Sequence, residues 1–169
     1  MSYKIRVSSR AIIINEDKIL LNCFGYGLYY NFPGGGIEEN ETAKKAVVRE
    51  VMEETGFSVT VGELVFLLEY VPKSCNENIS PNCPCSECSN THTISFFFRC
   101  YINNDILPQI PSHTDVNPDD PSITSECMWI NLSDLNDKNI LPAIQNPLLE
   151  YVKTGFFTPL FWAECERII

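Results

Sequence analysis

The sequence has few basic residues. It carries 12 Lys and Arg against 22 Asp and Glu, a formal net charge of -10 over 169 residues. Nucleic-acid backbones and anionic membranes attract proteins through basic surfaces. We therefore expect no nucleic-acid polymer and no membrane among the partners. A phosphate-bearing substrate would have to arrive together with a metal cation.

Long apolar runs are absent as well. The polar, basic start Met1–Arg10 does not resemble a secretory signal, and the apolar run Ala11–Ile14 stops at Asn15–Asp17. No segment is long enough to span a bilayer. These absences predict a cytoplasmic protein, in which the 8 cysteines would be thiols or metal ligands more often than disulfides.

The chain also lacks internal repeats and coiled-coil heptads, and its length suits one domain. Apolar runs around a turn composition predict a hairpin from 6–15 and 18–24, and further strands are expected within 58–71, 91–102 and 127–132. One helix, capped by Asn40 or Thr42 and ended by Gly56, and a second over 142–153 complete the pattern. The mixture predicts an α/β protein, a mixed sheet with helices on its faces.

What the chain does have is a glycine loop ahead of an acidic helix. Gly34–Gly36 precede a helical pattern that carries Glu50, Glu53 and Glu54 at spacings i, i+3 and i+4. Such side chains project from neighbouring turns of one face and would repel one another without a counter-ion. Carboxylate and carbonyl oxygens suit Mg²⁺ or Mn²⁺. The pattern indicates a divalent-metal site for phosphate chemistry.

The same stretch resembles the Nudix box. Its pattern is Gly, five residues, Glu, seven residues, then Arg-Glu-apolar-x-Glu-Glu-x-Gly-apolar, and it is filled here by Gly35, Glu41, Arg49, Glu50, Val51, Glu53, Glu54, Gly56 and Phe57. The resemblance implies that 1–169 form a single Nudix hydrolase domain, an α/β/α sandwich with a mixed β-sheet.

The resemblance also implies roles for the acidic residues. Glu50 and Glu54 would be the principal metal ligands, Glu53 a further ligand or the group that accepts a proton from water, and the Gly34 carbonyl would complete the site. A metal held in this way neutralises phosphate oxygens and activates water for attack on phosphorus.

Three more residues are implied around these ligands. Arg49 would hold the glutamates in place, and Glu41 would orient Arg49. Glu126, just ahead of a strand pattern, is a candidate for a further ligand or the catalytic base, and a solvent-facing glutamate is the alternative. The alternatives for that role in the preceding loop are Asp115, Asp119 and Asp120.

Substrate contacts are expected from aromatic, basic and glycine residues near the loop. Tyr30 and Phe32 are candidates for stacking on a nucleobase, although an aromatic in such a run more often packs in the core. Arg10 is a candidate for a phosphate, and Gly35 lets the backbone approach a ligand closely. Further candidates of the same kinds are Tyr26, Tyr29, Phe96–Phe98, Lys73 and Arg99.

A Cys-rich segment at about 73–90 departs from anything the box implies, and we interpret it as an inserted loop. Four of its thiols could hold a structural Zn²⁺, with His92 as an alternative ligand: Cys75, Cys83, Cys85 and Cys88. Their spacing matches paired Cys-x-x-Cys knuckles only in part, so an ordinary loop with an occasional disulfide is the other interpretation.

The leading functional hypothesis is hydrolysis of a pyrophosphate bond in a nucleoside diphosphate joined to another group. Pro72 lies 15 residues after Phe57. Members of the family that cleave ADP-ribose carry a proline near this position. Pro72 therefore favours ADP-ribose or a nucleotide sugar as the substrate. The alternatives are a nucleoside triphosphate pyrophosphohydrolase, a non-catalytic nucleotide-binding Nudix domain, and a structural protein built on a zinc loop. The family also makes a homodimer an expectation.

Overall fold

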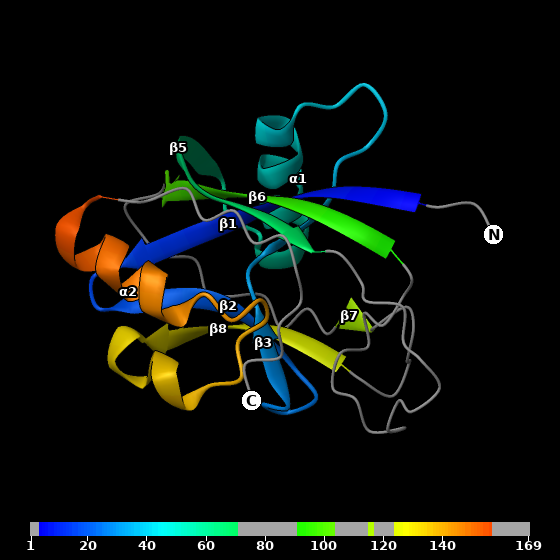
Figure 1. Cartoon of the computed structure of the whole chain (residues 1–169). Helices are drawn as coiled ribbons and strands as arrows, with labels where there is room; N and C mark the ends of the chain where they lie inside the picture. The colour runs from blue at the N-terminus through cyan, green and yellow to red at the C-terminus, as the bar shows by residue number, and fades with distance from the viewer. Residues whose placement is uncertain (1–3, 71–90, 104–114, 117–123, 157–169) are drawn as a thin grey trace.

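In the computed structural model, residues 4–70, 91–103, 115–116 and 124–156 are described (Figure 1). These residues form a sheet with one α-helix on each face. The elements in chain order are β1 (Lys4–Asn15), β2 (Lys18–Phe24), β3 (Tyr29–Asn31), β4 (Gly34–Gly36), α1 (Ala43–Thr55), β5 (Val59–Tyr70), β6 (Thr91–Ile102), β7 (Asp115–Val116), β8 (Thr124–Asn131), the 3-10 helix η1 (Leu132–Asp137) and α2 (Gln145–Thr154).

The sheet is mixed, with the strand order β5-β6-β1-β2-β8-β7. β1 runs parallel to β6 and antiparallel to β2 and β4, while β3 pairs with β2. The predicted hairpin is confirmed at its turn, where Ile14 faces Ile19, and beyond it β1 leaves β2 to pair with β4. β1 therefore connects the two halves of the sheet.

Alternation along the strands gives the sheet two apolar faces. Ala11 and Ile13 of β1 pack with Val47 and Val51 of α1, whereas Ile12 between them packs on the other side with the α2 residues Leu148 and Tyr151. We call these the α1 face and the α2 face. Successive side chains of a strand point to opposite faces, so a strand buried on both sides is apolar at nearly every position. The predicted α/β/α arrangement is confirmed.

Helix α1 begins and ends as its sequence predicts. The Thr42 hydroxyl accepts a hydrogen bond from the Lys45 amide at 3.3 Å, and Gly56 ends the helix at φ 71° with its amide donating to the Met52 carbonyl at 3.0 Å. Val47 and Val51 turn toward the sheet and are fully buried. The glutamates of α1 therefore lie outside this apolar stripe.

Some elements differ from the prediction. The sequence pattern did not predict the three-residue strands β3 and β4 within the aromatic and glycine stretch, and α2 begins at Gln145 instead of Pro142. The longest helix among the described residues, α1, has 13 residues, so none of the described helices could span a membrane. The predictions for the Cys-rich loop with Cys75, Cys83, Cys85 and Cys88, for Pro72 and Lys73, and for Asp119 and Asp120 fall outside the described residues.

Candidate active site

The glycine strand β4 lies between the central strand β1 and the helix α1. Gly34, Gly35 and Gly36 pair with Arg10, Ser9 and Ser8 of β1. Gly34 has φ 138°, and a Cβ at this position would lie 2.2 Å from the Ser9 carbonyl oxygen and 2.6 Å from the Arg10 Cα. Only glycine fits there, because a side chain would need both an unfavourable backbone conformation and space that the β1 backbone occupies.

Gly35 is required for a different reason. A Cβ on Gly35 would lie 2.5 Å from Oε1 of Glu50 and 2.6 Å from its carboxyl carbon. The Glu50 carboxylate therefore packs directly on the backbone of β4. At Gly36, in contrast, a Cβ would meet nothing within 4 Å. The three consecutive glycines have three different environments.

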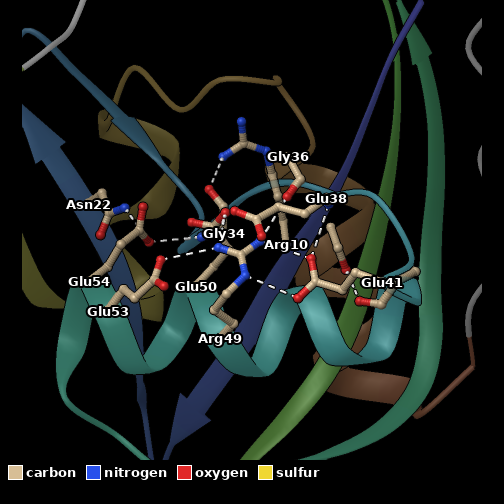
Figure 2. Close-up of polar contacts among 12 residues, drawn as sticks. Arg10, Asn22, Gly34, Gly36, Glu38, Glu41, Arg49, Glu50, Glu53 and Glu54 are labelled. Carbon is tan, nitrogen blue, oxygen red and sulfur yellow. Dashed lines mark hydrogen bonds and ion pairs between the residues drawn. The ribbon is translucent and has the colours of Figure 1, made fainter.

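Glu54 is fixed through one of its two oxygens. Its Oε2 accepts a hydrogen bond from the Gly34 amide at 2.8 Å and another from the Asn22 side-chain amide at 3.0 Å (Figure 2). Removal of the carboxyl from water raises its pKa to about 7; the two hydrogen bonds and the charge of Arg10 act in the opposite direction, and the charge of Glu50 raises it further. The protein thus holds a costly carboxylate in one orientation beside β4.

Arg49 connects the other acidic residues (Figure 2). Its guanidinium donates to both carboxylate oxygens of Glu41, at 3.0 Å each, to Glu50 Oε1 at 2.9 Å and to Glu53 Oε2 at 3.1 Å. It also donates to the Gly36 carbonyl at 3.0 Å, which ties α1 to β4. The hydrogen bond from Arg49 lowers the pKa of Glu41, and Glu41 is the largest cause of the raised pKa of Arg49. The bidentate contact with Glu41 orients the Arg49 guanidinium group.

The donor set fits a hard divalent cation in its chemistry. Glu50, Glu53 and Glu54 offer carboxylate oxygens on one side of α1, and among the described residues nothing engages Oε1 of Glu54. In the described part of the chain, no three His, Cys, Asp or Glu side chains form a ready metal-holding group. Arg49 binds Oε1 of Glu50 and Oε2 of Glu53, which leaves the second oxygen of each carboxylate for a cation among the described residues.

Arg10 reaches the site from β1 (Figure 2). Its Nη1 donates to the Phe32 carbonyl at 3.0 Å and lies 3.5 Å from the Gly34 carbonyl oxygen. The guanidinium therefore lies next to the carbonyl that the sequence suggested as a metal ligand. The positive charge of Arg10 lowers the pKa of the Glu54 carboxyl, against the larger effect of burial.

Tyr30 and Phe32 are not brought to the site. Tyr30 lies opposite Cys23 in the β2–β3 pair, and both belong to the core on the α2 face. Phe32 is fully buried in the same core and packs edge-on against Phe97. Both side chains are buried, so neither presents a ring face on which a nucleobase could stack.

Glu126 also points away from Glu54. It is exposed on β8 and lies opposite Cys23 of β2, a residue of the α2-face core. Residues directly opposite each other in an antiparallel pair project to the same face. The neighbouring Cys127, opposite Asn22, occupies the α1 face instead. Asp115, an alternative to Glu126, pairs with Ser125 in β7.

The sequence reasoning missed Asn22 and Cys127. Asn22 lies in β2, where its side-chain amide donates to Glu54, and the Cys127 thiol of β8 donates to the Asn22 side-chain oxygen. The available signal was a single amide in the otherwise apolar run Ile19–Phe24. A buried polar group in such a strand requires hydrogen-bond partners, so it marks a contact that the strand alone does not reveal.

The fold and this acidic helix together define a protein of the Nudix type. A sequence model of the NUDIX domain matches residues 4–151. The chain therefore belongs to the Nudix family.

Several solved structures share the fold. A Nudix hydrolase from Nitrosomonas europaea superposes with a TM-score of 0.65 at 22% identity, over 93% of this chain and 94% of that one. A UDP-X diphosphatase superposes with a TM-score of 0.61 at 18% identity, over 95% of this chain and 68% of that one. An ADP-ribose pyrophosphatase from Streptococcus suis superposes with a TM-score of 0.55 at 21% identity, over 93% of this chain and 98% of that one. At such identities the likeness concerns the fold alone.

A curated relative matches over a shorter segment. The 8-oxo-dGTP diphosphatase of Proteus vulgaris is 50% identical over 34 residues, which are 20% of this chain. The match spans 30% of that relative's length. It therefore indicates a shared segment without extending the relative's substrate to this chain.

Proposed function

We propose that this Nudix hydrolase cleaves a pyrophosphate bond in a nucleotide-derived substrate with the help of Mg²⁺ or Mn²⁺. The observation that carries the proposal is the Glu54 carboxylate. It is withdrawn from water and fixed through Oε2 beside Gly34, with two further glutamates of the same helix next to it. A protein gains nothing in stability from such an arrangement, and a cation offsets the cost.

Glu50, Glu54 and the Gly34 carbonyl would hold the cation, with Glu53 as a third carboxylate near them. A hard cation in this position supplies charge neutralisation for phosphate oxygens and a more acidic water. Glu53, whose side chain is 58% exposed, is the carboxylate with most access to solvent and would accept the proton from the attacking water. Arg49 keeps Glu50 and Glu53 in place before substrate arrives.

Arg10 would meet the substrate phosphates. Its guanidinium lies next to the Gly34 carbonyl and is the cation of β1 that influences Glu54. Planar guanidinium groups bind phosphate oxygens through paired N–H donors. Gly35 would contribute by letting the Glu50 carboxylate lie directly against the β4 backbone, because a side chain at this position would collide with it.

For the substrate we propose a nucleoside diphosphate joined to another group, ADP-ribose or a nucleotide sugar. The position of Pro72 supports this choice, and proteins named UDP-X diphosphatase and ADP-ribose pyrophosphatase share the fold. A nucleoside triphosphate is the second candidate, supported by the 34-residue match to an 8-oxo-dGTP diphosphatase. A non-catalytic nucleotide-binding role is disfavoured by the complete glutamate set. We further expect a cytoplasmic protein and a homodimer.

The test is product release from ADP-ribose, nucleotide sugars, dinucleoside polyphosphates and nucleoside triphosphates with Mg²⁺ or Mn²⁺. We expect turnover of one class that stops when EDTA removes the cation and resumes when the cation is restored. Folded protein that turns over none of these compounds would contradict the proposal. Zinc analysis of the same purified protein decides between the two interpretations of the Cys-rich loop.

Gly35→Ala is expected to lower activity with little loss of stability. The new methyl group would displace the Glu50 carboxylate, the far end of a flexible side chain, and a shift of about 1 Å in an active site costs on the order of 100-fold in rate. The measurement is kcat/KM together with thermal unfolding. Gly36→Ala is the matched control and should behave as wild type, because a Cβ there meets nothing within 4 Å. Equal activity of the two variants would argue against a role for Glu50.

A further inference from the structure

Strand β2 carries a buried amide among apolar residues on the α1 face. Asn22 is 6% exposed, and its neighbours Leu20 and Leu21 are fully buried. A buried side-chain amide without partners would cost a few kcal/mol, roughly 1 to 3. Asn22 has two partners from elements distant in sequence, Glu54 of α1 and Cys127 of β8.

The two partners fix the orientation of the amide. An ionised carboxylate can only accept a hydrogen bond, so Nδ2 of Asn22 has to face Glu54. The Cys127 thiol donates to Oδ1 on the other side. A rotated amide would set Oδ1 against the carboxylate and NH₂ against the thiol hydrogen, and would lose both contacts. The three groups form a directed relay: Cys127 to Asn22 to Glu54.

The relay ends on one particular oxygen of Glu54. Asn22 Nδ2 and the Gly34 amide both donate to Oε2, at 3.0 Å and 2.8 Å. Two donors on one oxygen restrain both the position and the rotation of the carboxylate. Oε1 is then the atom that remains for another ligand within the described structure. The Gly34 amide alone would leave the carboxylate free to turn about that single bond.

We propose that Asn22, held by Cys127, is a positioning residue that keeps Oε2 of Glu54 engaged and Oε1 directed to the divalent cation. The inference rests on the proposed function in taking Glu54 as a cation ligand. Groups that orient metal ligands commonly contribute 10-fold to 100-fold in metal affinity. The contribution of Asn22 is therefore measurable on the cation itself, without substrate.

The experiment is Mn²⁺ titration of the full chain followed by electron paramagnetic resonance of the free ion. We expect Asn22→Leu to weaken Mn²⁺ binding by about 10-fold or more. Asn103→Leu is the matched control, since Asn103 is an exposed amide that contacts Ser58 and Thr60 and not the acidic residues, and its affinity should equal that of wild type. Thermal unfolding shows that both variants are folded. Wild-type Mn²⁺ affinity in folded Asn22→Leu would overturn the proposal.

Cys127 supplies the second arm of the test. Cys127→Ala removes the donor to Oδ1 and should weaken Mn²⁺ binding by less than Asn22→Leu, while Cys127→Ser restores a donor and should recover the affinity. In the double variant with Asn22→Leu, the relay predicts that Cys127→Ala causes no further loss of Mn²⁺ affinity, because the thiol would influence Glu54 through Asn22. Additive losses would show that Cys127 has a separate structural effect, and that result would overturn the relay.

The two proposals fail in different ways. Wild-type protein that binds Mn²⁺ yet hydrolyses no member of the nucleotide panel would contradict the proposed function, and the affinities of the variants would still decide the relay. Wild-type protein that hydrolyses substrate while Asn22→Leu retains full Mn²⁺ affinity would contradict the relay alone. Wild-type protein that binds no Mn²⁺ would overturn both.

Discussion

Glu54→Gln is expected to reduce kcat/KM by about 100-fold to 10,000-fold, the range for loss of several kcal/mol of metal-derived stabilisation. The reason is specific to the hydrogen bonds of this carboxylate. Asn22 and the Gly34 amide both donate to Oε2, so the glutamine will place its carbonyl oxygen there. Its NH₂ then takes the place of Oε1 and points a donor at the cation.

The variant should remain folded, because glutamine has the shape of glutamate and no charge to remove from water. The measurement is steady-state kinetics with Mg²⁺, accompanied by thermal unfolding. Glu150→Gln, an exposed position on α2, is the control and should retain wild-type kinetics. Comparable rates for Glu54→Gln and wild type would exclude Glu54 as a ligand and leave Glu50 and Glu53 to carry the site.

Gly34→Ala is expected to lower the free energy of unfolding by about 3 to 5 kcal/mol. Two costs add. A side chain at φ 138° is strained, and its Cβ would lie 2.2 Å from the Ser9 carbonyl oxygen, an atom of the central strand that cannot move without breaking the β1–β4 pairing. Urea unfolding followed by circular dichroism measures the loss.

Two other glycines separate these costs. Gly155→Ala has a positive φ of 69° and no atom within 4 Å of the new methyl group, so it should show the strain alone, about 1 kcal/mol. Gly36→Ala has neither a positive φ nor a contact within 4 Å, and should leave the midpoint unchanged. If Gly34→Ala lowered the free energy of unfolding no more than Gly155→Ala does, that result would contradict the close contact between β4 and the β1 backbone.

The sequence predicted those parts of the fold that local interactions determine. The caps at Thr42 and Gly56 and the apolar stripe of Val47 and Val51 lie within one turn of the helix they specify, so α1 was predicted with its ends. The strands β3 and β4 were missed because three residues carry too little alternation to mark a strand. Their existence depends on pairing with β2 and β1, which a local pattern does not contain.

The site, like the fold, was predictable where local spacing along the chain determines it. Spacing along one helix places Glu50, Glu53 and Glu54 on one side, and the structure has them there. The residues contributed by strands were predicted less well, because strand register decides which face each residue occupies. Glu126 lies on the α2 face, whereas the next residue of β8, Cys127, lies on the α1 face opposite Asn22. The same alternation directs Tyr30 into the core opposite Cys23.

The parallel pairing of β1 with β6 has a consequence for synthesis of the chain. Ser8 and Ser95, whose hydroxyls bond across this pair, are 87 residues apart, so a ribosome adding 5 to 20 residues per second needs roughly 4 to 17 s between them. During that interval β2 and β4 can already cover one edge of β1, while the other edge still exposes the N–H and C=O groups that later pair with β6. The nascent chain therefore passes through a half-built sheet that is prone to aggregate, and we expect its yield in cells to depend on chaperones and on the speed of translation.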